Sequence, residues 1–345
     1  MGLGKIDFER IVMCAAEVGI SDIHIAEGEP VYWRRCGCLS PLREFIPTAE
    51  DIFKIFQRFV TEADMEKFIA EKALNIAWEF NHFRYRIHVY YKRAKVAFAM
   101  RVLPRKIPQM ESLGQAGKIE QYAGCRSGLL LVTGATGSGK TTTVAALLER
   151  LNETDTLHIL TLEDPIEFIY DKGCSLISQL EYGQDFLTYA EGVEHAMRES
   201  PDVIMVSEMR DSQTVEAVLN AAASGHFVIA TMHAGSVIEA VERIISMYPS
   251  EKQNMVKSLL ASVLVGIQTQ QLVTRRGGNR VCAVETIKGT NAVKNLIRSG
   301  KFEQLVNIMQ AGRHEGMQTM EMGLESIKER EILRPHTPAI YCACE

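Results

Sequence analysis

The sequence of 345 residues contains no apolar run that approaches the roughly 20 residues needed to cross a bilayer. Its first residues, MGLGKIDFERIVMCAAEVG, include acids and lack the apolar core of a cleavable signal peptide. We therefore expect a cytoplasmic protein without a transmembrane segment. A strong basic excess is also missing, because 38 lysines and arginines stand against 43 acids and leave a formal net charge of −5. This balance disfavours nucleic acid as the main partner.

The eight cysteines do not form the paired C-x-x-C units that build structural zinc sites. Two close C-x-C pairs occur, Cys36 with Cys38 and Cys342 with Cys344. A metal site made from these four would require distant ends of the chain to meet, so reduced structural thiols are the favoured interpretation. The hydrophobic content of 46% and the charged content of 23% are typical of a globular protein, and the length allows two or three domains.

The segment LLLVTGATGSGKTTT at Leu129–Thr143 is the most specific pattern that is present. An apolar run with strand character leads into a glycine-rich loop and then into the helix-favouring VAALLERL, which is the order that a P-loop needs. The glycines let backbone N–H groups surround a phosphate, Lys140 adds a charge, and the Thr141 hydroxyl is the expected ligand of Mg²⁺. The predicted nucleotide-binding residues are Gly134, Ala135, Thr136, Gly137, Ser138, Gly139, Lys140, Thr141 and Thr142.

Apolar strand patterns and helical patterns alternate on both sides of this loop. The strand patterns occur at 129–133, 157–162, 202–207 and 226–232. They predict a mostly parallel sheet covered on both faces by helices, with ligands at the carboxyl ends of the strands. Beyond the last of them we expect a helix from about 251 to 272, a strand at Val281–Ile287 and helices to about residue 330.

The residues before the P-loop indicate a separate α+β domain. Helical spacing at 6–18, 49–59 and 62–72 alternates with strand patterns, and FRYRIHVYYKRAKVAFAMRVL reads as two strands joined by a basic turn at Lys92–Lys95. Two prolines and a glycine mark a linker. The predicted division is therefore an N-terminal domain at 1–103, a linker at 104–116, a nucleotide-binding domain at 117–330 and a loosely attached tail at 331–345.

Polar side chains follow three of the predicted strands. Glu208 ends the strand in ESPDVIMVSEMRD, where a Walker B acid reaches Mg²⁺ directly or through water. TLEDPIEF ends another strand with Glu163, Asp164 and Glu167, and we expect one of these carboxylates to orient the water that attacks a γ-phosphate, although a solvated acidic loop is the alternative. His233 ends HFVIATMH, and the sequence leaves open whether this histidine senses phosphate or is structural.

The strand pair before the linker is rich in arginine and lysine. Alternation puts Arg84 and Arg86 on one side of the first strand. A solvated basic face is one interpretation. The other is an arginine supplied to the nucleotide of a neighbouring subunit, which is worth about 10³–10⁵ in rate.

The segments GATGSGKTTT, TLEDPIEF, MRESPDVIMVSEMRD and SGHFVIATMH occur in this order and closely resemble the Walker A, Asp box, Walker B and His box of the secretion and pilus motor ATPases. GISDIHIAEGEPVYWRRCG is similar to the opening module of that family, so the resemblance covers about residues 5–330. It is nearest to the PilT-like type IV pilus retraction group. The chain begins close to this module, has no tetracysteine insert, and carries at 291–324 a segment similar to the group's AIRNLIRE region.

The resemblance implies a PAS-like α+β domain joined to a RecA-like P-loop ATPase domain, an α/β architecture with a flexible linker. It also implies a homo-hexamer that uses ATP and Mg²⁺ and works peripherally at the inner membrane on a platform protein of a pilus or secretion machine. The implied roles are phosphate and metal binding for Lys140 and Thr141, water activation for Glu163, metal support for Glu208, phosphate sensing for His233, nucleotide closure by Arg86 and Arg101 with Arg84 as the next candidate, and a cis contact for Arg198. Closure and release would rotate one domain against the other as a power stroke.

The sequence departs from the family pattern without losing a catalytic group. Ser207 stands where glycine commonly precedes the Walker B acid, Ala135 replaces a proline, MHAG replaces LHT, and Ser299 with Gly300 replaces an expected acid. A PilT-like ATPase of a type II or type IV secretion or conjugation system is therefore an alternative. A non-hydrolysing scaffold, which would release no phosphate, and a nucleic-acid motor, which single-stranded DNA would stimulate, are weaker alternatives.

Overall fold

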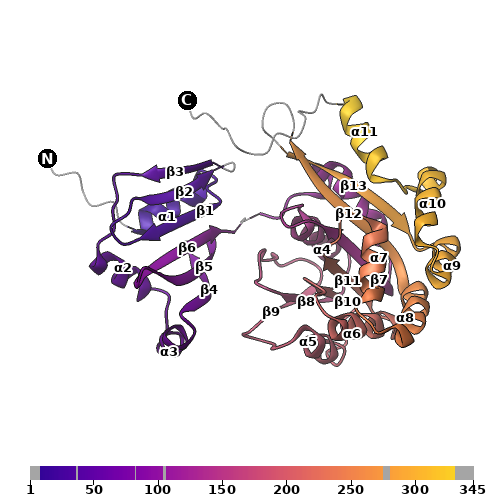
Figure 1. Cartoon of the computed structure of the whole chain (residues 1–345), viewed down its shortest axis with the longest axis horizontal. Coiled ribbons are helices and arrows are strands. Elements are labelled where there is room, and N and C mark those ends of the chain that lie inside the picture. Colours follow the sequence, from indigo (N-terminus) through magenta and orange to yellow (C-terminus); the bar gives the residue numbers. More distant parts are fainter. Residues whose placement is uncertain (1–7, 36–37, 82, 104–105, 275–279, 331–345) are drawn as a thin grey trace. The chain divides into compact units, whose positions relative to one another are not determined.

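The computed structural model describes residues 8–35, 38–81, 83–103, 106–274 and 280–330, which form two compact units that divide between Lys106 and Ile107 (Figure 1). The predicted tail and three of the four paired cysteines lie outside these ranges. In the described ranges no group of three or more histidine, cysteine, aspartate or glutamate residues is arranged to hold a metal ion. No helix in the same ranges is both long and apolar enough to cross a bilayer.

The first unit is a six-stranded antiparallel sheet with three helices, in the strand order β3-β2-β1-β6-β5-β4. Its elements are α1 (Phe8–Glu17), β1 (Asp22–Ala26), β2 (Val31–Arg35), β3 (Cys38–Leu42), α2 (Ala49–Phe56), α3 (Glu62–Glu71), β4 (Ala73–Phe80), β5 (Phe83–Lys92) and β6 (Lys95–Val102). In β5 the alternate residues Tyr85, Ile87 and Val89 are buried and pack with α1, whose Val12 carbonyl accepts a 3.0 Å bond from the Tyr85 hydroxyl. One face of β5 therefore builds the core, and the other carries polar side chains.

The helices of this unit begin where the sequence offers side-chain caps. Thr48 precedes α2 and Thr61 precedes α3, and each hydroxyl accepts from the backbone N–H three residues later while that residue's aspartate returns the contact. Such capping boxes satisfy backbone donors that an isolated helix start leaves unpaired.

The second unit is a seven-stranded sheet in the order β13-β12-β7-β11-β10-β8-β9, parallel except for β13 at one edge. Its strands are β7 (Gly128–Gly134), β8 (His158–Glu163), β9 (Leu176–Glu181), β10 (Val203–Val206), β11 (Phe227–Met232), β12 (Leu264–Thr274) and β13 (Arg280–Lys288). Its helices are η1 (Met110–Tyr122), α4 (Lys140–Thr154), α5 (Tyr189–Ala196), α6 (Ser212–Ala223), α7 (Val237–Ser246), α8 (Ser250–Val263), α9 (Asn291–Ser299), η2 (Phe302–Gln304), α10 (Leu305–Ala311), η3 (Gly312–Glu315) and α11 (Met320–Arg330).

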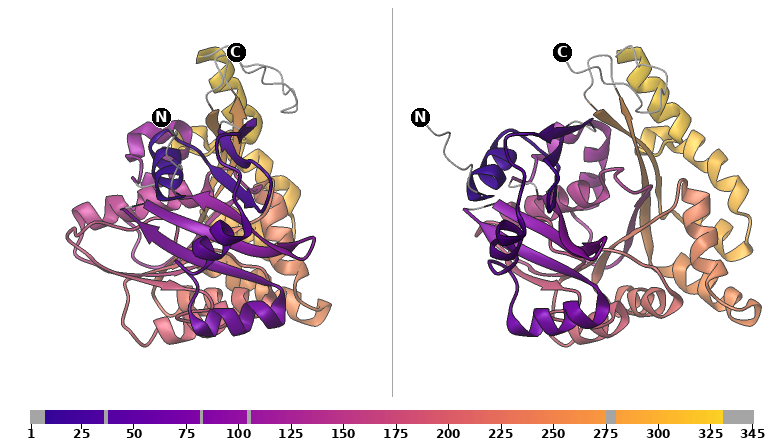
Figure 2. Two further views of the ribbon diagram at one scale, coloured as in Figure 1. Left: turned by 90° about the vertical axis from the view of Figure 1, so that its left-hand side faces the viewer. Right: turned by 60° about the vertical axis from the view of Figure 1, so that its left-hand side comes forward.

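Helices cover both faces of this sheet (Figure 2). In β7, Leu129 and Leu131 pack with α5 to α8, whereas Leu130 and Val132 pack with α4 and η1. Burial on both faces explains why β7 reads as an unbroken apolar run rather than as an alternating one. The predicted parallel sheet with two covered faces is confirmed.

Two expectations about this unit differ from the structure. The helix expected over 251–272 is wrong beyond Val263, where α8 ends and β12 begins, because residues 264–270 pair in parallel with β7. The segment predicted as a linker at 104–116 overlaps η1, and Met110, which lies in the overlap, is buried in one cluster with residues of β7 and α4. The edge strand β9 escaped prediction because most of its residues are only half-buried and show no clear period.

Candidate nucleotide-binding and hydrolysis site

The glycine-rich loop lies between β7 and α4, in the order that the sequence predicted. Gly134, Gly137 and Gly139 have φ values of 147°, 74° and 91°, a backbone region that residues with a Cβ rarely adopt. Space is a second constraint at Gly134, because a Cβ there would lie 2.5 Å from both the Gln270 carbonyl oxygen and Ser138 Oγ. The close approach of β12 therefore requires glycine at this position.

The loop carries the polar groups that suit a phosphate. Gly139 is the residue before α4, so the N–H groups of the first turn and the positive end of the helix are directed at the loop. Ser138 Oγ and Gln270 Oε1 are buried and have no hydrogen-bond partner in the described part of the chain. Gln270 Nε2 donates 2.9 Å to Thr143 Oγ1 and ties β12 to α4. The N–H groups of the first turn of α4 and the free Ser138 hydroxyl can donate to the phosphates of a nucleotide.

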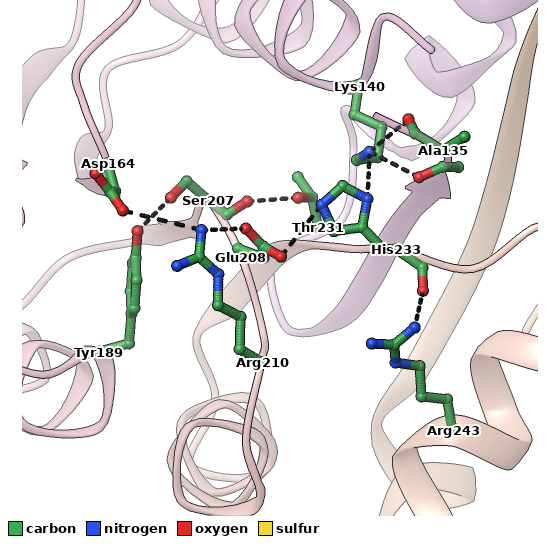
Figure 3. Close-up of polar contacts among 11 residues, drawn as sticks. Ala135, Lys140, Asp164, Tyr189, Ser207, Glu208, Arg210, Thr231, His233 and Arg243 are labelled. Carbon is green, nitrogen blue, oxygen red and sulfur yellow. Dashed lines mark hydrogen bonds and ion pairs between the residues drawn. The ribbon is translucent and has the colours of Figure 1, made fainter. Parts of the chain in front are cut away.

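The side chains that follow the neighbouring strands meet the P-loop lysine (Figure 3). Lys140 Nζ donates to the carbonyl oxygens of Gly134 at 2.7 Å and Ala135 at 3.0 Å, and lies 3.4 Å from His233 Nδ1. His233 Nε2 is in turn 3.2 Å from Glu208 Oε1. Burial lowers the pKa of Lys140, and the nearby Glu208 carboxylate partly opposes that shift.

Arg210 extends this network and was not predicted from the sequence. Its guanidinium lies 2.7 Å from Glu208 Oε2 and 3.9 Å from Asp164 Oδ2, so it joins the acids that follow β10 and β8. The hydrogen bond to Glu208 raises the pKa of Arg210 above its already high value. The available signal was its position two residues after a strand-end carboxylate. Glu208 and the hydroxyl of Thr141 are oxygen donors of the kind that Mg²⁺ prefers.

Glu163 ends β8 and is only 4% exposed. Its Oε1 accepts from Thr161 Oγ1 at 2.7 Å and from Gln179 Nε2 of β9 at 3.0 Å. Burial raises the pKa of this carboxyl, while the hydrogen bonds from Thr161 and Gln179 oppose that shift. A fixed, poorly solvated carboxylate of this kind is a stronger base than an exposed one. Gln179 was not predicted because residues 176–181 of β9 show no clear strand period.

Ser207, the departure from the family pattern, makes two contacts beside the Walker B acid. Its Oγ lies 2.7 Å from the hydroxyl of Tyr189 in α5, and its carbonyl accepts from Thr231 Oγ1 of β11. Burial raises the pKa of Tyr189 to about 12, so the phenol stays protonated and can donate. The serine thus links α5, β10 and β11 directly before Glu208.

Three of the four arginines proposed for closure or contact lie in the first unit. Arg84 and Arg86 share the polar face of β5, and the register pairs Arg86 with Arg101 of β6 and Arg101 with Asp22 of β1. Arg101 Nε donates 3.1 Å to Asp22 Oδ1, and the other carboxylate oxygen, Asp22 Oδ2, lies 3.8 Å from Arg34 Nε of β2. Basic and acidic side chains therefore line one face of this sheet across four adjacent strands.

Arg198 lies apart from the strand-end network within one chain. It is exposed and precedes β10, whereas Glu208 follows the same strand. Because a parallel strand carries its ends to opposite edges of the sheet, Arg198 starts at the edge away from the P-loop. The predicted cis contact of Arg198 has no counterpart among the contacts of this site.

A P-loop between a parallel strand and a helix, with acids and a histidine after the adjacent strands, defines a RecA-like P-loop ATPase domain, here preceded by an α+β domain. The chain matches the family model described as "Type II/IV secretion system protein" over residues 7–332 and belongs to that family. It is similar to the type IV pilus retraction ATPase PilT of Pseudomonas aeruginosa, with 35% identity covering 95% of this chain and 96% of the relative.

Two further comparisons agree with this assignment. A protein of Neisseria gonorrhoeae named "Twitching motility protein" is 37% identical, over 79% of this chain and 74% of its own length. The crystal structure of the pilus retraction motor PilT with bound ADP superposes with a TM-score of 0.88 and 35% identity, over 95% of this chain and 94% of that one.

Proposed function

We propose that this chain is a motor ATPase that hydrolyses ATP to power type IV pilus retraction and works as a ring of six copies. The observation that carries the proposal is that one histidine contacts both the P-loop lysine and the Walker B carboxylate, while a second, buried carboxylate ends the strand β8 of the same sheet. The names of the relatives at 35% and 37% identity support pilus retraction as the work that this ATPase performs.

In this proposal the P-loop amides and the Lys140 ammonium hold the β- and γ-phosphates of ATP. Thr141 and Glu208 would hold Mg²⁺, which when bound supplies positive charge to those phosphates. Glu163 takes a proton from the attacking water as the new oxygen–phosphorus bond forms and the bond to ADP breaks. His233, between Lys140 and Glu208, reports the presence of the γ-phosphate to the segment that follows it.

Conversion of this chemistry into movement needs the first unit. Arg86 and Arg101 are cross-strand neighbours, and Arg84 shares the face of Arg86, so together they offer a concentrated positive charge to a phosphate. We propose that these arginines close over a nucleotide in the ring, and that their release after hydrolysis rotates the two units against one another. The recipient of that movement would be a platform protein of the inner membrane.

Glu208→Gln in the full chain tests hydrolysis. We expect the variant to bind a fluorescent ATP analogue, because the P-loop is intact, and to release phosphate about 10²-fold more slowly, because a charge at the reacting phosphates is lost. Glu216→Gln, an exposed acid on α6, is the matched control and should turn over normally. Near-normal phosphate release by Glu208→Gln would show that this acid is misassigned.

Pilus retraction needs a separate test in cells. Expression of this chain in a Pseudomonas aeruginosa strain that lacks its retraction ATPase should restore the twitching zone, and the Glu208→Gln variant should not. Turnover in the tube without any restored twitching would favour the secretion or conjugation alternative. The segment to exchange in that case is α9, which ends at Ser299 and is closed by Gly300 in a left-handed conformation where the family pattern has an acid.

A further inference from the structure

Glu285 is a buried carboxylate that the proposed chemistry does not use. It lies in β13 and is 7% exposed, whereas the other buried carboxylates of the described residues, Glu163 and Glu181, end the strands β8 and β9 beside the site. Removal of a carboxylate from water is costly unless its oxygens are well paired. The partners of Glu285 therefore indicate what this residue does.

The two oxygens of Glu285 hold the first residues of two different helices. Oε1 accepts from the backbone N–H of Val237, the first residue of α7, at 2.6 Å, and Oε2 accepts from that of Met320, the first residue of α11, at 3.2 Å. Burial raises the pKa of the Glu285 carboxyl, and the two N–H groups oppose this shift. The positive ends of both helices favour the ionised form.

Helix α7 also holds the backbone around His233. Arg243 of α7 donates 2.8 Å to the His233 carbonyl oxygen, and Glu239 accepts 2.6 Å from the Gly235 N–H. The segment between β11 and α7 is therefore fastened to the helix at several points. A shift of the His233 backbone must move α7 or break these bonds.

A continuous set of contacts thus leads from the P-loop to the C-terminal helix. Lys140 and Glu208 contact the His233 ring, α7 holds the His233 backbone, and Glu285 joins α7 to α11. Both helices pack against β13, which lies at the edge of the sheet (Figure 1). Because one carboxylate has an oxygen bonded to each helix, the two bonds cannot both be kept if only one helix moves.

We propose that Glu285 is a positioning residue that sets α7, and through it His233, and that couples nucleotide occupancy at the P-loop to the start of α11. The proposal rests on the proposed nucleotide-binding function and adds to it a defined output in the C-terminal helices. If Glu285 had only a structural role, it would slow hydrogen exchange of the α11 backbone equally in the presence and absence of nucleotide. If it couples the two sites, the rate of that exchange depends on nucleotide.

The test is hydrogen exchange of the full chain, with and without ADP or a non-hydrolysable ATP analogue, in the peptide that covers the first turn of α11. We expect the ATP analogue to slow exchange there by about threefold or more in the wild type, because opening of this turn becomes less frequent. Glu285→Gln keeps one carbonyl acceptor and loses the second. It should abolish the nucleotide-dependent difference and lower kcat more than it raises KM. Glu325→Gln, an exposed acid on α11, should behave as the wild type.

Arg243→Gln cuts the same pathway on the other side of α7 without touching Glu285, and it should also remove the difference at α11. This exposed substitution keeps the proposal testable if the Glu285 variant does not fold. Wild-type turnover without any change at α11, or a nucleotide-dependent difference that survives in both variants, would overturn the coupling alone. Failure of the wild type to bind nucleotide would overturn the proposed function as well.

Discussion

Charged residues are placed differently in the two units. In the first unit the acid–base pairs, such as Arg101 with Asp22 and Lys95 with Glu27, lie on the faces and edges of a sheet whose core is apolar. In the second unit Lys140, Glu208 and Glu163 gather at the carboxyl edge of a sheet that is covered on both faces, and they are wholly or partly removed from water. Lys140 and Glu208 of the second unit both contact His233 beside the P-loop, whereas Arg101 of the first unit pairs with an acid on the face of its own sheet.

The largest effect that we expect would show that the first unit, too, contributes a side chain to catalysis. Arg86→Ala should lower kcat by about 10³-fold in the assembled ring, since an arginine supplied to a γ-phosphate is worth at least that much. The unfolding free energy should change by about 1 kcal/mol or less, because surface charge pairs contribute little. Phosphate release and thermal unfolding of the same preparation measure the two quantities. Arg35→Ala, an exposed arginine on β2, is the control, and equal loss in both variants would mean that charge alone matters.

A second prediction concerns the buried carboxylate of the second unit, Glu163, whose ionisation should control the pH dependence of turnover. Only the ionised Glu163 can accept a proton, and burial raises its pKa above the usual 4.5. The value of kcat should therefore decline by about tenfold per pH unit as the pH falls below that raised pKa. Glu163→Gln should lower kcat by about 10²-fold, and its residual activity should lack this acidic limb. An unchanged limb in the variant would assign the titration to another group.

The smallest effect concerns stability in the first unit. Asp22 lies between Arg34 and Arg101, so Asp22→Asn leaves two arginines without their shared carboxylate. Because these guanidinium groups are well exposed, we expect a loss of only about 0.5–1 kcal/mol in unfolding free energy, measured by urea titration. Glu44→Gln, an exposed acid outside the sheet, should be neutral. A loss of several kcal/mol would show that this row of charges is part of the folding core.

Local patterns explain which parts of the site were predictable. The P-loop glycines and the strand-end positions of Glu163, Glu208 and His233 follow from short sequence segments, because phosphate binding and parallel strands impose their own spacing. Residues 264–272 were misjudged as helix because a short apolar run does not separate a buried strand from a helix, and only pairing with β7 decides.

Contacts between distant segments were beyond prediction. Gln179 reaches Glu163 from an edge strand with no clear period, and the two oxygens of Glu285 bind helices that begin 48 residues before it and 35 residues after it. Such pairs depend on how the sheet is ordered, and the order β13-β12-β7 places the last two strands of the described residues beside the first strand of the unit.

The tight approach of β12 behind Gly134 has a consequence for how the protein can be divided. A truncated chain that stops at residue 263 would retain every recognisable nucleotide motif, yet its phosphate loop would lack the neighbouring strand β12 against which Gly134 packs. We expect such a fragment to lose affinity for ATP. Triphosphate binding therefore requires the complete sheet. During synthesis it becomes possible only after the ribosome has translated β12, which includes Gln270.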